Sequence, residues 1–357
     1  MAKRKKKKVM LGLFILIAIL IAVVVVLYIN REKVADIPII NNIVEKIEEP
    51  PKKVQVIDLE SNTRPFAVMI NNNSAVWKYQ SGLNDAYIVY EMLVEGGITR
   101  EMAVFKGANV PKIQSVRSSR HYFLDYALEN DAVYVHWGWS PQAQSDISSL
   151  KINNINGLTY EGTYFFRDST IKGIGIEHKG YTSSESINKA IANLKYRSTT
   201  EAKPLLKYDV DSIDMDSIPD VQNASYVEVK FSGYHTSKWY YDEDTKVYKK
   251  KQNSTDMIDY NSNKPFTAKN IITYQIGYSG IPGDTYGRLN ASNIGNGSGY
   301  YITEGKAVPI KWSKSSRSEQ TKYTLEDGTE LTVNDGNTYI EIQPKGQSIK
   351  ISEEIPE

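Results

Sequence analysis

The sequence has no cysteine among its 357 residues. Disulfide bridges, thiol chemistry, cysteine-ligated metals and attachment of a lipid to an N-terminal cysteine are therefore all excluded. Net charge is nearly absent as well, because 43 Lys and Arg side chains oppose 42 Asp and Glu side chains, for a formal charge of +1. Such a balance gives no general attraction to nucleic acid, so we expect no nucleic-acid partner.

Common catalytic and metal-binding motifs are also missing. The four histidines are scattered, with neither His-x-x-x-His nor His-Glu-x-x-His spacing, so we expect no metal site and no cofactor. No Gly-x-Ser-x-Gly occurs, which makes a serine hydrolase a weak hypothesis. The glycine-rich stretch Gly295–Gly299 lies between two expected strands, so it predicts a loop and not a phosphate-binding turn before a helix.

Long apolar runs are scarce, and the exception begins near the N-terminus. Residues 9–29, VMLGLFILIAILIAVVVVLYI, carry no charge and, at ~1.5 Å rise per residue, are long enough as a helix to cross ~30 Å of hydrocarbon. Residues 1–8 contain the basic run KRKKKK, and no small-residue cleavage pattern follows the apolar run. The sequence predicts an uncleaved, single-pass transmembrane helix in the cell membrane, with a cytoplasmic N-terminus and the bulk of the chain extracytoplasmic.

The rest of the chain divides into a stalk, two domains and a tail. Residues 30–62 mix charges with prolines and predict an extended stalk. Strand-like and helix-like patterns alternate over 63–206, which predicts an α+β domain. An acidic stretch without an apolar face, 207–218, predicts a linker. Short β-runs with Asp-Gly and Glu-Gly turns over 219–344 predict a mainly antiparallel β domain, before a tail at 345–357, so the expected fold class is α+β.

Charged residues are placed unusually within the apolar stretch YIVYEMLVEGGITREMAVF, Tyr87–Phe105. If Gly96-Gly97 forms a two-residue hairpin loop, side chains that alternate along the strands put Glu91, Glu95 and Arg100 on one side. Arg100 then lies diagonally between the two glutamates. At ~3.3 Å per residue the glutamates are about 13 Å apart along the strand, too far for the carboxylate pair of a retaining glycosidase.

Two interpretations of this hairpin stay open. One is an internal Glu-Arg-Glu ion network that satisfies itself. The other is a functional site in which an apolar environment keeps Glu95, or else Glu91, protonated as a general acid. Candidate binding companions lie at strand ends and helix starts, which often converge at one mouth of a domain. They are Arg100, Arg117, Arg120, His136, Arg167, Asp168 and His178.

Some of these companions have a structural explanation. His136 lies between Val135 and Trp137, in an apolar strand, where a satisfied core histidine is the more common outcome. Trp137 and Trp139 could stack on a sugar face or pack against a sheet.

Several motifs, taken in order, resemble the YerB-like family of bacterial cell-envelope proteins. They are RPFAVMINN, QSGLNDAYIVYEMLVEGGITR, SVRSSRHYF, DAVYVHWGWSPQA, FFRD and HKGYTS, and the C-terminal β-runs resemble the C-terminal domain of that family. The resemblance covers nearly all of the chain expected to be exported. It implies an envelope location and a two-domain architecture, but no catalytic residues, because the family has no established function. The chain lacks the lipidated cysteine usual in the family, and the expected transmembrane helix would replace that anchor.

These features predict a membrane-anchored extracytoplasmic protein that binds peptidoglycan or a cell-wall synthesis protein. The alternative is an enzyme that cleaves or modifies peptidoglycan with Glu95 or Glu91 as general acid, and the sequence leaves open whether the chain is an enzyme. A third hypothesis is a scaffold whose tyrosine-rich β domain docks a membrane partner, since the chain has 25 tyrosines and 8 phenylalanines.

Overall fold

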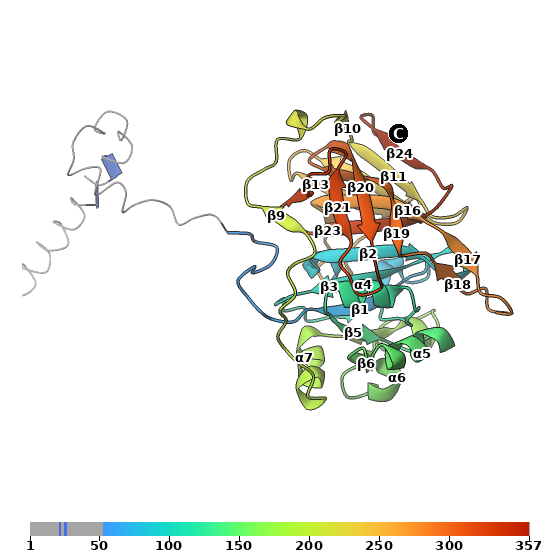
Figure 1. Ribbon diagram of the computed structural model, residues 1–357. Coiled ribbons are helices and arrows are strands. Elements are labelled where there is room, and N and C mark those ends of the chain that lie inside the picture. The colour runs from blue at the N-terminus through green and yellow to red at the C-terminus, as the bar shows by residue number, and fades with distance from the viewer. Residues whose placement is uncertain (1–20, 23–24, 27–52, 357) are drawn as a thin grey trace, which may run out of the picture. The chain divides into compact units, whose positions relative to one another are not determined.

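Strands from both halves of the chain build one large mixed sheet (Figure 1). The computed structural model describes residues 21–22, 25–26 and 53–356, and Val54–Glu357 form one compact unit. Within the described residues this sheet has 11 strands. From one edge to the other they are β10 (Gln222–Asn223), β20 (Lys306–Lys314), β19 (Gly295–Thr303), β16 (Asn270–Ile276), β23 (Thr338–Pro344), β2 (Ile88–Leu93), β3 (Thr99–Phe105), β1 (Phe66–Asn72), β5 (Val133–His136) and β6 (Asn154–Asn156), with β21 (Lys322–Leu325) paired to β20.

A second sheet of six strands packs on one face of the large sheet. Its order is β14 (Thr255–Asp256), β13 (Val247–Gln252), β12 (Thr236–Asp242), β11 (Tyr226–Lys230) and β24 (Ile349–Ser352), with β15 (Thr267–Ala268) paired to β13. Smaller pairings join β17 (Tyr278–Gly280) to β18 (Leu289–Ala291), β22 (Thr332–Asn334) to β9 (Lys207–Asp209), and β4 (Ile113–Gln114) through β8 (Gly180–Thr182) to β7 (Phe166–Arg167).

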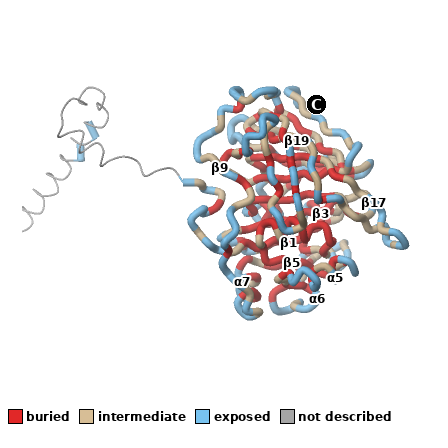
Figure 2. The backbone as a smooth tube through the Cα atoms, in the orientation of Figure 1, coloured by how far each residue is buried: buried red, intermediate tan, exposed pale blue. Residues whose placement is uncertain are grey.

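The central strands are buried on both faces, as the red tube in Figure 2 shows. On β2, Val89 points into the core between the two sheets, where Trp239 and Tyr248 of the second sheet meet it. Its neighbour Tyr90 points to the opposite core, under helix α4 (Phe123–Glu129). Two covered faces explain the unbroken apolar runs in these strands, such as Phe66–Ile70 in β1 and Ile88–Tyr90 in β2.

The helices of residues 53–356 are short, and α4 packs on the core that Tyr90 enters, with six of its seven residues buried. In helix α5 (Pro141–Ser149), Ser140 Oγ accepts a hydrogen bond from the N–H of Ala143, and Pro141 stands in the first turn. Helix α7 (Ser184–Asn193) is capped by Ser183 and buries one apolar face. A fourth helix within residues 53–356 is α6 (Gly157–Tyr160).

The expected α+β class is wrong: the fold is mainly β. The helices of residues 63–206 do form, but the strands between them continue the large sheet. Strand β2 pairs in parallel with β23, so that Ile88 lies opposite Thr338, and β23 in turn pairs with β16. The sheet therefore runs without a break from the N-terminal to the C-terminal part of the chain.

The segments on either side of residues 63–206 contribute to the same unit. Ile57, within the expected stalk, is buried, and the N–H of Val56 donates to Asp335 Oδ1 at 2.9 Å. Within the expected linker, Met215 is buried and β9 pairs in parallel with β22.

The expected transmembrane helix is not supported. Most of residues 9–29 lies outside the described residues. Over 21–22, 25–26 and 53–356, no helix is both long enough and apolar enough to cross a membrane.

Candidate functional site

The hairpin that joins β2 to β3 turns through three residues, not two. Glu95–Gly97 form a short 3₁₀ turn (η4), with Gly96 and Gly97 at φ of 74° and 72°, and the N–H of Val94 donates to the carbonyl of Ile98 at 2.8 Å. The extra residue shifts the register by one relative to a two-residue loop. Because side chains alternate along a strand, that shift moves Arg100 to the face opposite Glu91. The predicted Glu-Arg-Glu arrangement on one side is therefore wrong.

Glu95 instead reaches two arginines, one from β3 and one from the segment before α4. Arg120 holds it in a fork, with Nε donating to Oε2 at 2.9 Å and Nη2 donating to Oε1. Arg100 approaches the same Oε1 with its Nη2 at 3.8 Å. Backbone carbonyls also hold both guanidiniums in place. Arg100 Nη1 donates to the carbonyl of Ser118, and Arg120 Nη1 donates to the carbonyl of Ser119, each at 2.8 Å.

Two further arginines extend this group. Arg117 Nη1 donates to the carbonyl of Glu177 at 3.0 Å, and Arg167 lies over the ring of Trp137, with 4.4 Å from Cζ to the ring centroid. The pKa of Arg117 is lowered by burial and by the positive charges of Arg100 and Arg167, against the opposing charge of Glu177. Arg100, Arg117, Arg120 and Arg167 are called the arginine cluster below.

Arg100 and Arg120 are the buried members of the cluster. The side chain of Arg167 is 23% exposed, and its Nε and Nη2 already donate to the carboxylate of Glu161. Burial lowers the pKa of Arg100 to about 10, and burial also lowers the pKa of Arg120. The Nε of Arg100 is buried and has no hydrogen-bond partner among the described residues. A buried guanidinium with a free donor is costly unless an anion pairs with it.

His178 lies beside the cluster, whereas His136 and Asp168 serve other contacts. His178 Nδ1 is 2.9 Å from Asn71 Nδ2, and burial together with Arg117 lowers its pKa. Burial lowers the pKa of His136 to about 4, while its ring nitrogens contact the Gly138 carbonyl and Asn154 Oδ1. The carboxylate of Asp168 pairs with the ammonium of Lys112.

Glu91 belongs to a different feature, a row of three glutamates on the face between the two sheets. Glu101 of β3 and Glu341 of β23 both lie opposite Glu91 of β2 in the strand register. All three side chains are at most 1% exposed. We call Glu91, Glu101 and Glu341 the buried glutamate row.

A single lysine from the second sheet meets this row. Lys250 of β13 donates from Nζ to Glu91 Oε2 and to Glu101 Oε1, both at 2.6 Å. His235 Nε2 lies 3.3 Å from Glu91 Oε1, and Trp239 Nε1 donates to Glu341 Oε1 at 3.0 Å. The row thus joins the two sheets through charged hydrogen bonds.

Three carboxyl groups against one ammonium leave an excess of acid in the interior. Burial would raise the pKa of Glu91, but Lys250 and His235 outweigh burial and lower it. Burial, and then the charge of Glu91, raise the pKa of Glu341 well above its ordinary value, and Glu341 Oε2 has no hydrogen-bond partner among the described residues. Burial also raises the pKa of Glu101, but Glu101 accepts a hydrogen bond from the Lys250 ammonium. Glu341 accepts only from the neutral Trp239, so it is the member of the row that we expect to keep its proton near neutral pH.

Glu341→Gln should make the protein more stable than wild type as the pH rises. The folded state holds a proton on Glu341 above pH ~4.3, where the unfolded chain releases it, so wild-type stability falls with rising pH by about 1.4 kcal/mol for each unit of raised pKa. Gln keeps the acceptor for Trp239 and removes this dependence. Urea unfolding of both proteins at pH 5 to 8 measures the difference, and a difference that stays constant with pH would contradict a protonated Glu341.

The sequence named the four arginines among its candidates, and Glu91, but it did not indicate the buried glutamate row. Glu101 lies inside the stretch Tyr87–Phe105, yet only the other charges there drew attention. A detectable sign was present at Glu341, which interrupts the apolar run of Tyr339, Ile340 and Ile342.

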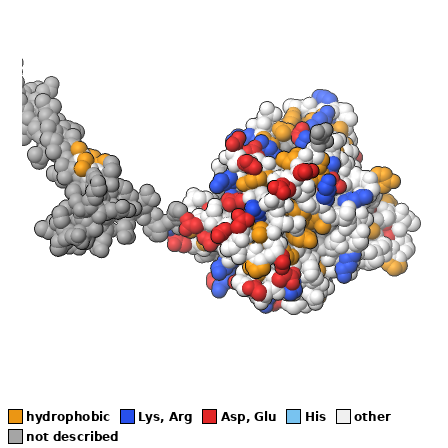
Figure 3. All heavy atoms as spheres, turned by 90° about the horizontal axis from the view of Figure 1, so that it is seen from above, with side chains coloured by type: hydrophobic (Ala, Val, Ile, Leu, Met, Phe, Trp, Pro, Cys, Tyr) orange, Lys and Arg blue, Asp and Glu red, His pale blue; other side chains and the backbone are white. Residues whose placement is uncertain are grey.

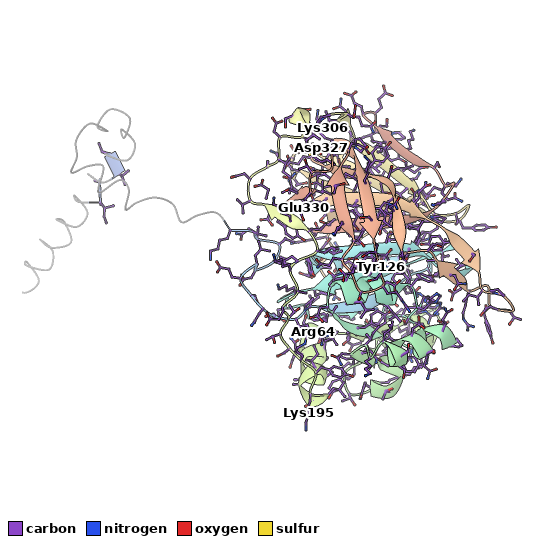
Figure 4. All side chains as sticks on the ribbon, in the orientation of Figure 1. Arg64, Tyr126, Lys195, Lys306, Asp327 and Glu330 are labelled. Carbon is purple, nitrogen blue, oxygen red and sulfur yellow. The ribbon has the colours of Figure 1, made fainter. Side chains whose placement is uncertain are left out.

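Charged side chains of both signs lie on the surface of the compact unit (Figure 3). On the face seen in Figure 3, acidic and basic side chains are interspersed. Figure 4 shows Tyr126 of α4 near the middle of the unit, where its hydroxyl is 3.3 Å from that of Tyr274, while Lys195 and Lys306 lie toward its two ends.

Known proteins share this sequence and fold. Residues 54–197 match the "Protein of unknown function (DUF3048) N-terminal domain" and residues 227–340 match the corresponding C-terminal domain. The chain is 29% identical over 318 residues to a Bacillus subtilis (strain 168) protein described as "Putative lipoprotein YerB", over 88% of this chain and 91% of the relative. The crystal structure of the YerB protein from Bacillus subtilis matches with a TM-score of 0.70 and 29% identity, over 81% of this chain and 94% of that one. The resemblance noted in the sequence is confirmed, and the chain belongs to the DUF3048 family.

Proposed function

We propose that this protein works in the cell envelope, outside the membrane, and binds an anionic cell-wall polymer, peptidoglycan foremost, through the arginine cluster. The observation that carries the proposal is the Nε of Arg100, which is buried and has no partner within the described part of the chain, in a group of four guanidiniums. Arginine presents donors in a planar fork that suits carboxylate and phosphate groups, and wall polymers carry both.

The envelope location is supported by the relative in Bacillus subtilis, whose description is "Putative lipoprotein YerB". The absence of cysteine means that this chain does not share a lipid anchor on cysteine.

The enzyme alternative has less support from the geometry. Glu91 is fully buried, and its lowered pKa keeps it ionised, which does not suit a general acid. Glu95 is held in the Arg120 fork, where a positive partner favours the carboxylate form. Neither glutamate is thus placed to deliver a proton to a glycosidic oxygen.

Sedimentation with purified peptidoglycan tests the proposal and separates it from the enzyme alternative. The full-length chain should sediment with the wall material and be released by high salt, because salt screens charge pairing. Mass spectrometry of the supernatant should find no new glycan or peptide fragments. A protein that stays in the supernatant at low salt would remove the wall-binding proposal, and released fragments that disappear with Glu95→Gln would favour the enzyme.

A further inference from the structure

We propose that the arginine cluster takes a free carboxylate group and that the side chain of Glu95 occupies this position until the ligand displaces it. The inference rests on the proposed function, since it names the chemical group of the wall ligand and the way in which access to it is controlled. The structure supports it through three observations: how Glu95 is held, what is exposed around it, and where it lies in the chain.

The way that Glu95 is held defines the ligand group. Two oxygens of one planar carboxylate meet Nε and Nη2 of Arg120, while the remaining Nη1 donates to the backbone carbonyl of Ser119. The fork is thereby fixed toward the carboxylate, which is the arrangement that recognises a carboxylate ligand. A ligand carboxylate that replaces Glu95 brings the same charge and the same shape, so the exchange leaves the charge balance of the site unchanged.

Exposure shows which partner can leave. The side chain of Glu95 is 24% exposed, whereas those of Arg100 and Arg120 are 7% and 9% exposed. Glu95 is therefore the outer member and covers the two guanidiniums. Arg100 approaches it only at 3.8 Å, and no described residue accepts from its Nε, so the internal carboxylate leaves part of the donor set unfilled. A ligand that also reaches Arg100 would gain contacts that Glu95 does not make.

The position of Glu95 lets its side chain leave without disturbing the sheet. Its turn is anchored at the far end, where Ser232 Oγ donates to the Gly97 carbonyl at 2.5 Å and Val94 pairs with Ile98. Among the described residues outside Glu95–Gly97, no atom lies within 4 Å of the place where a Cβ of Gly96 would be, so the tip of the turn is open. Because the backbone of the turn is held, we expect rotation about the side-chain bonds of Glu95 to open the site.

The test compares Glu95→Gln with wild type, using N-acetylalanine as the carboxylate probe. Gln keeps the size of the side chain but removes the competing charge, so the full-length variant should bind the probe at least about tenfold more tightly. N-acetylalaninamide, which lacks the charge, and inorganic phosphate should bind either protein more weakly than N-acetylalanine. Titration calorimetry and NMR titration give the dissociation constants, and Glu243→Gln on the exposed turn after β12 is the control, which should behave as wild type.

Each outcome of this test has a definite meaning. If Glu95→Gln binds the probe no more tightly than wild type, and its unfolding temperature shows that it is folded, the claim that a ligand displaces Glu95 is overturned. Tighter binding of phosphate than of N-acetylalanine overturns the choice of carboxylate. Should Glu95→Gln fold poorly, Glu95→Ala serves the same comparison. If the protein sediments with peptidoglycan but Glu95→Gln gains no affinity for the probe, this inference fails while the proposed function stands. If Glu95→Gln binds the probe more tightly but the protein does not sediment with peptidoglycan, the proposed function fails, and with it the assignment of the carboxylate to a wall ligand.

Discussion

Lys250→Met should destabilise the protein by about 3–5 kcal/mol, because removing one partner from a buried ion pair leaves uncompensated charge. In wild type its ammonium bridges Glu91 and Glu101, and none of the three side chains is more than 1% exposed. Met fills a similar volume but leaves two buried carboxyl groups without their positive partner. Thr99 still donates to Glu91 and Gln80 to Glu101, but these are neutral donors, so one or both carboxyl groups must take up a proton or lose their burial. The unfolding free energy from urea titration measures the loss.

The neighbouring lysine is a matched control. Lys251 lies on the other face of the same strand, pairs with Asp256 at 3.2 Å and is 34% exposed at the side chain. Exposed pairs contribute ~0–1 kcal/mol, so Lys251→Met should change the unfolding free energy by no more than that. Equal losses of unfolding free energy for the two variants would show that the buried ion pairs of Lys250 contribute no more than an exposed pair.

A compensating variant separates charge from packing. Adding Glu91→Gln and Glu101→Gln to Lys250→Met removes the unpaired carboxyl groups and should recover part of the lost stability, since the three sites are coupled. No recovery would mean that the loss comes from packing around the Lys250 chain and not from its charge.

The buried glutamate row also positions the hairpin that carries the arginine cluster. Thr99, beside Arg100 on β3, donates from Oγ1 to Glu91 Oε1 at 2.6 Å, and its Oγ1 is 2.7 Å from His235 Nε2. His235 follows the loop from which Ser232 holds the turn of Glu95. The charges on the inner face of the hairpin thus fix the backbone from which Glu95 and Arg100 project on the other side.

The sequence marked the four arginines as candidates because they lie close to recognisable boundaries. Arg100 follows the Gly-Gly turn on β3, Arg117 and Arg120 precede α4, and the fourth, Arg167, ends β7. Polar side chains at such points tend to meet. That the four form a binding site stays a prediction. The register of the hairpin could not be predicted in the same way. A Gly-Gly pair suits both a two-residue and a three-residue turn, and a difference of one residue reverses the face of every side chain.

Long-range pairing accounts for what the sequence did not reveal. Lys250 lies 159 residues from Glu91, and nothing local to either residue indicates the other. The same is true of the parallel pairing of β2 with β23, which joins regions that local patterns divide into an α+β and a β domain. Helix caps and strand patterns describe segments, whereas the fold class depends on which distant strands become neighbours.

Arg117→Glu should reduce retention on peptidoglycan by about 100-fold or more, which corresponds to the loss of a charged contact and the gain of a repulsive one. The new carboxylate would lie among Arg100 and Arg167, whose charges already act on Arg117, and would pair with them in place of a ligand. Arg117 makes one hydrogen bond to a backbone carbonyl, so the substitution disturbs the fold less than a change at the more buried Arg100.

Lys322→Glu is the matched control, because it changes the net charge equally at an exposed position on β21, the strand paired to β20 at the edge of the large sheet. If wall binding depended only on overall charge, the two variants would lose retention to the same degree, and salt would weaken both alike. A specific site predicts a large loss for Arg117→Glu and nearly unchanged retention for Lys322→Glu, measured as the fraction sedimented over a range of peptidoglycan concentrations. If Arg117→Glu is retained on peptidoglycan as fully as wild type, the ligand binds at a surface other than the arginine cluster.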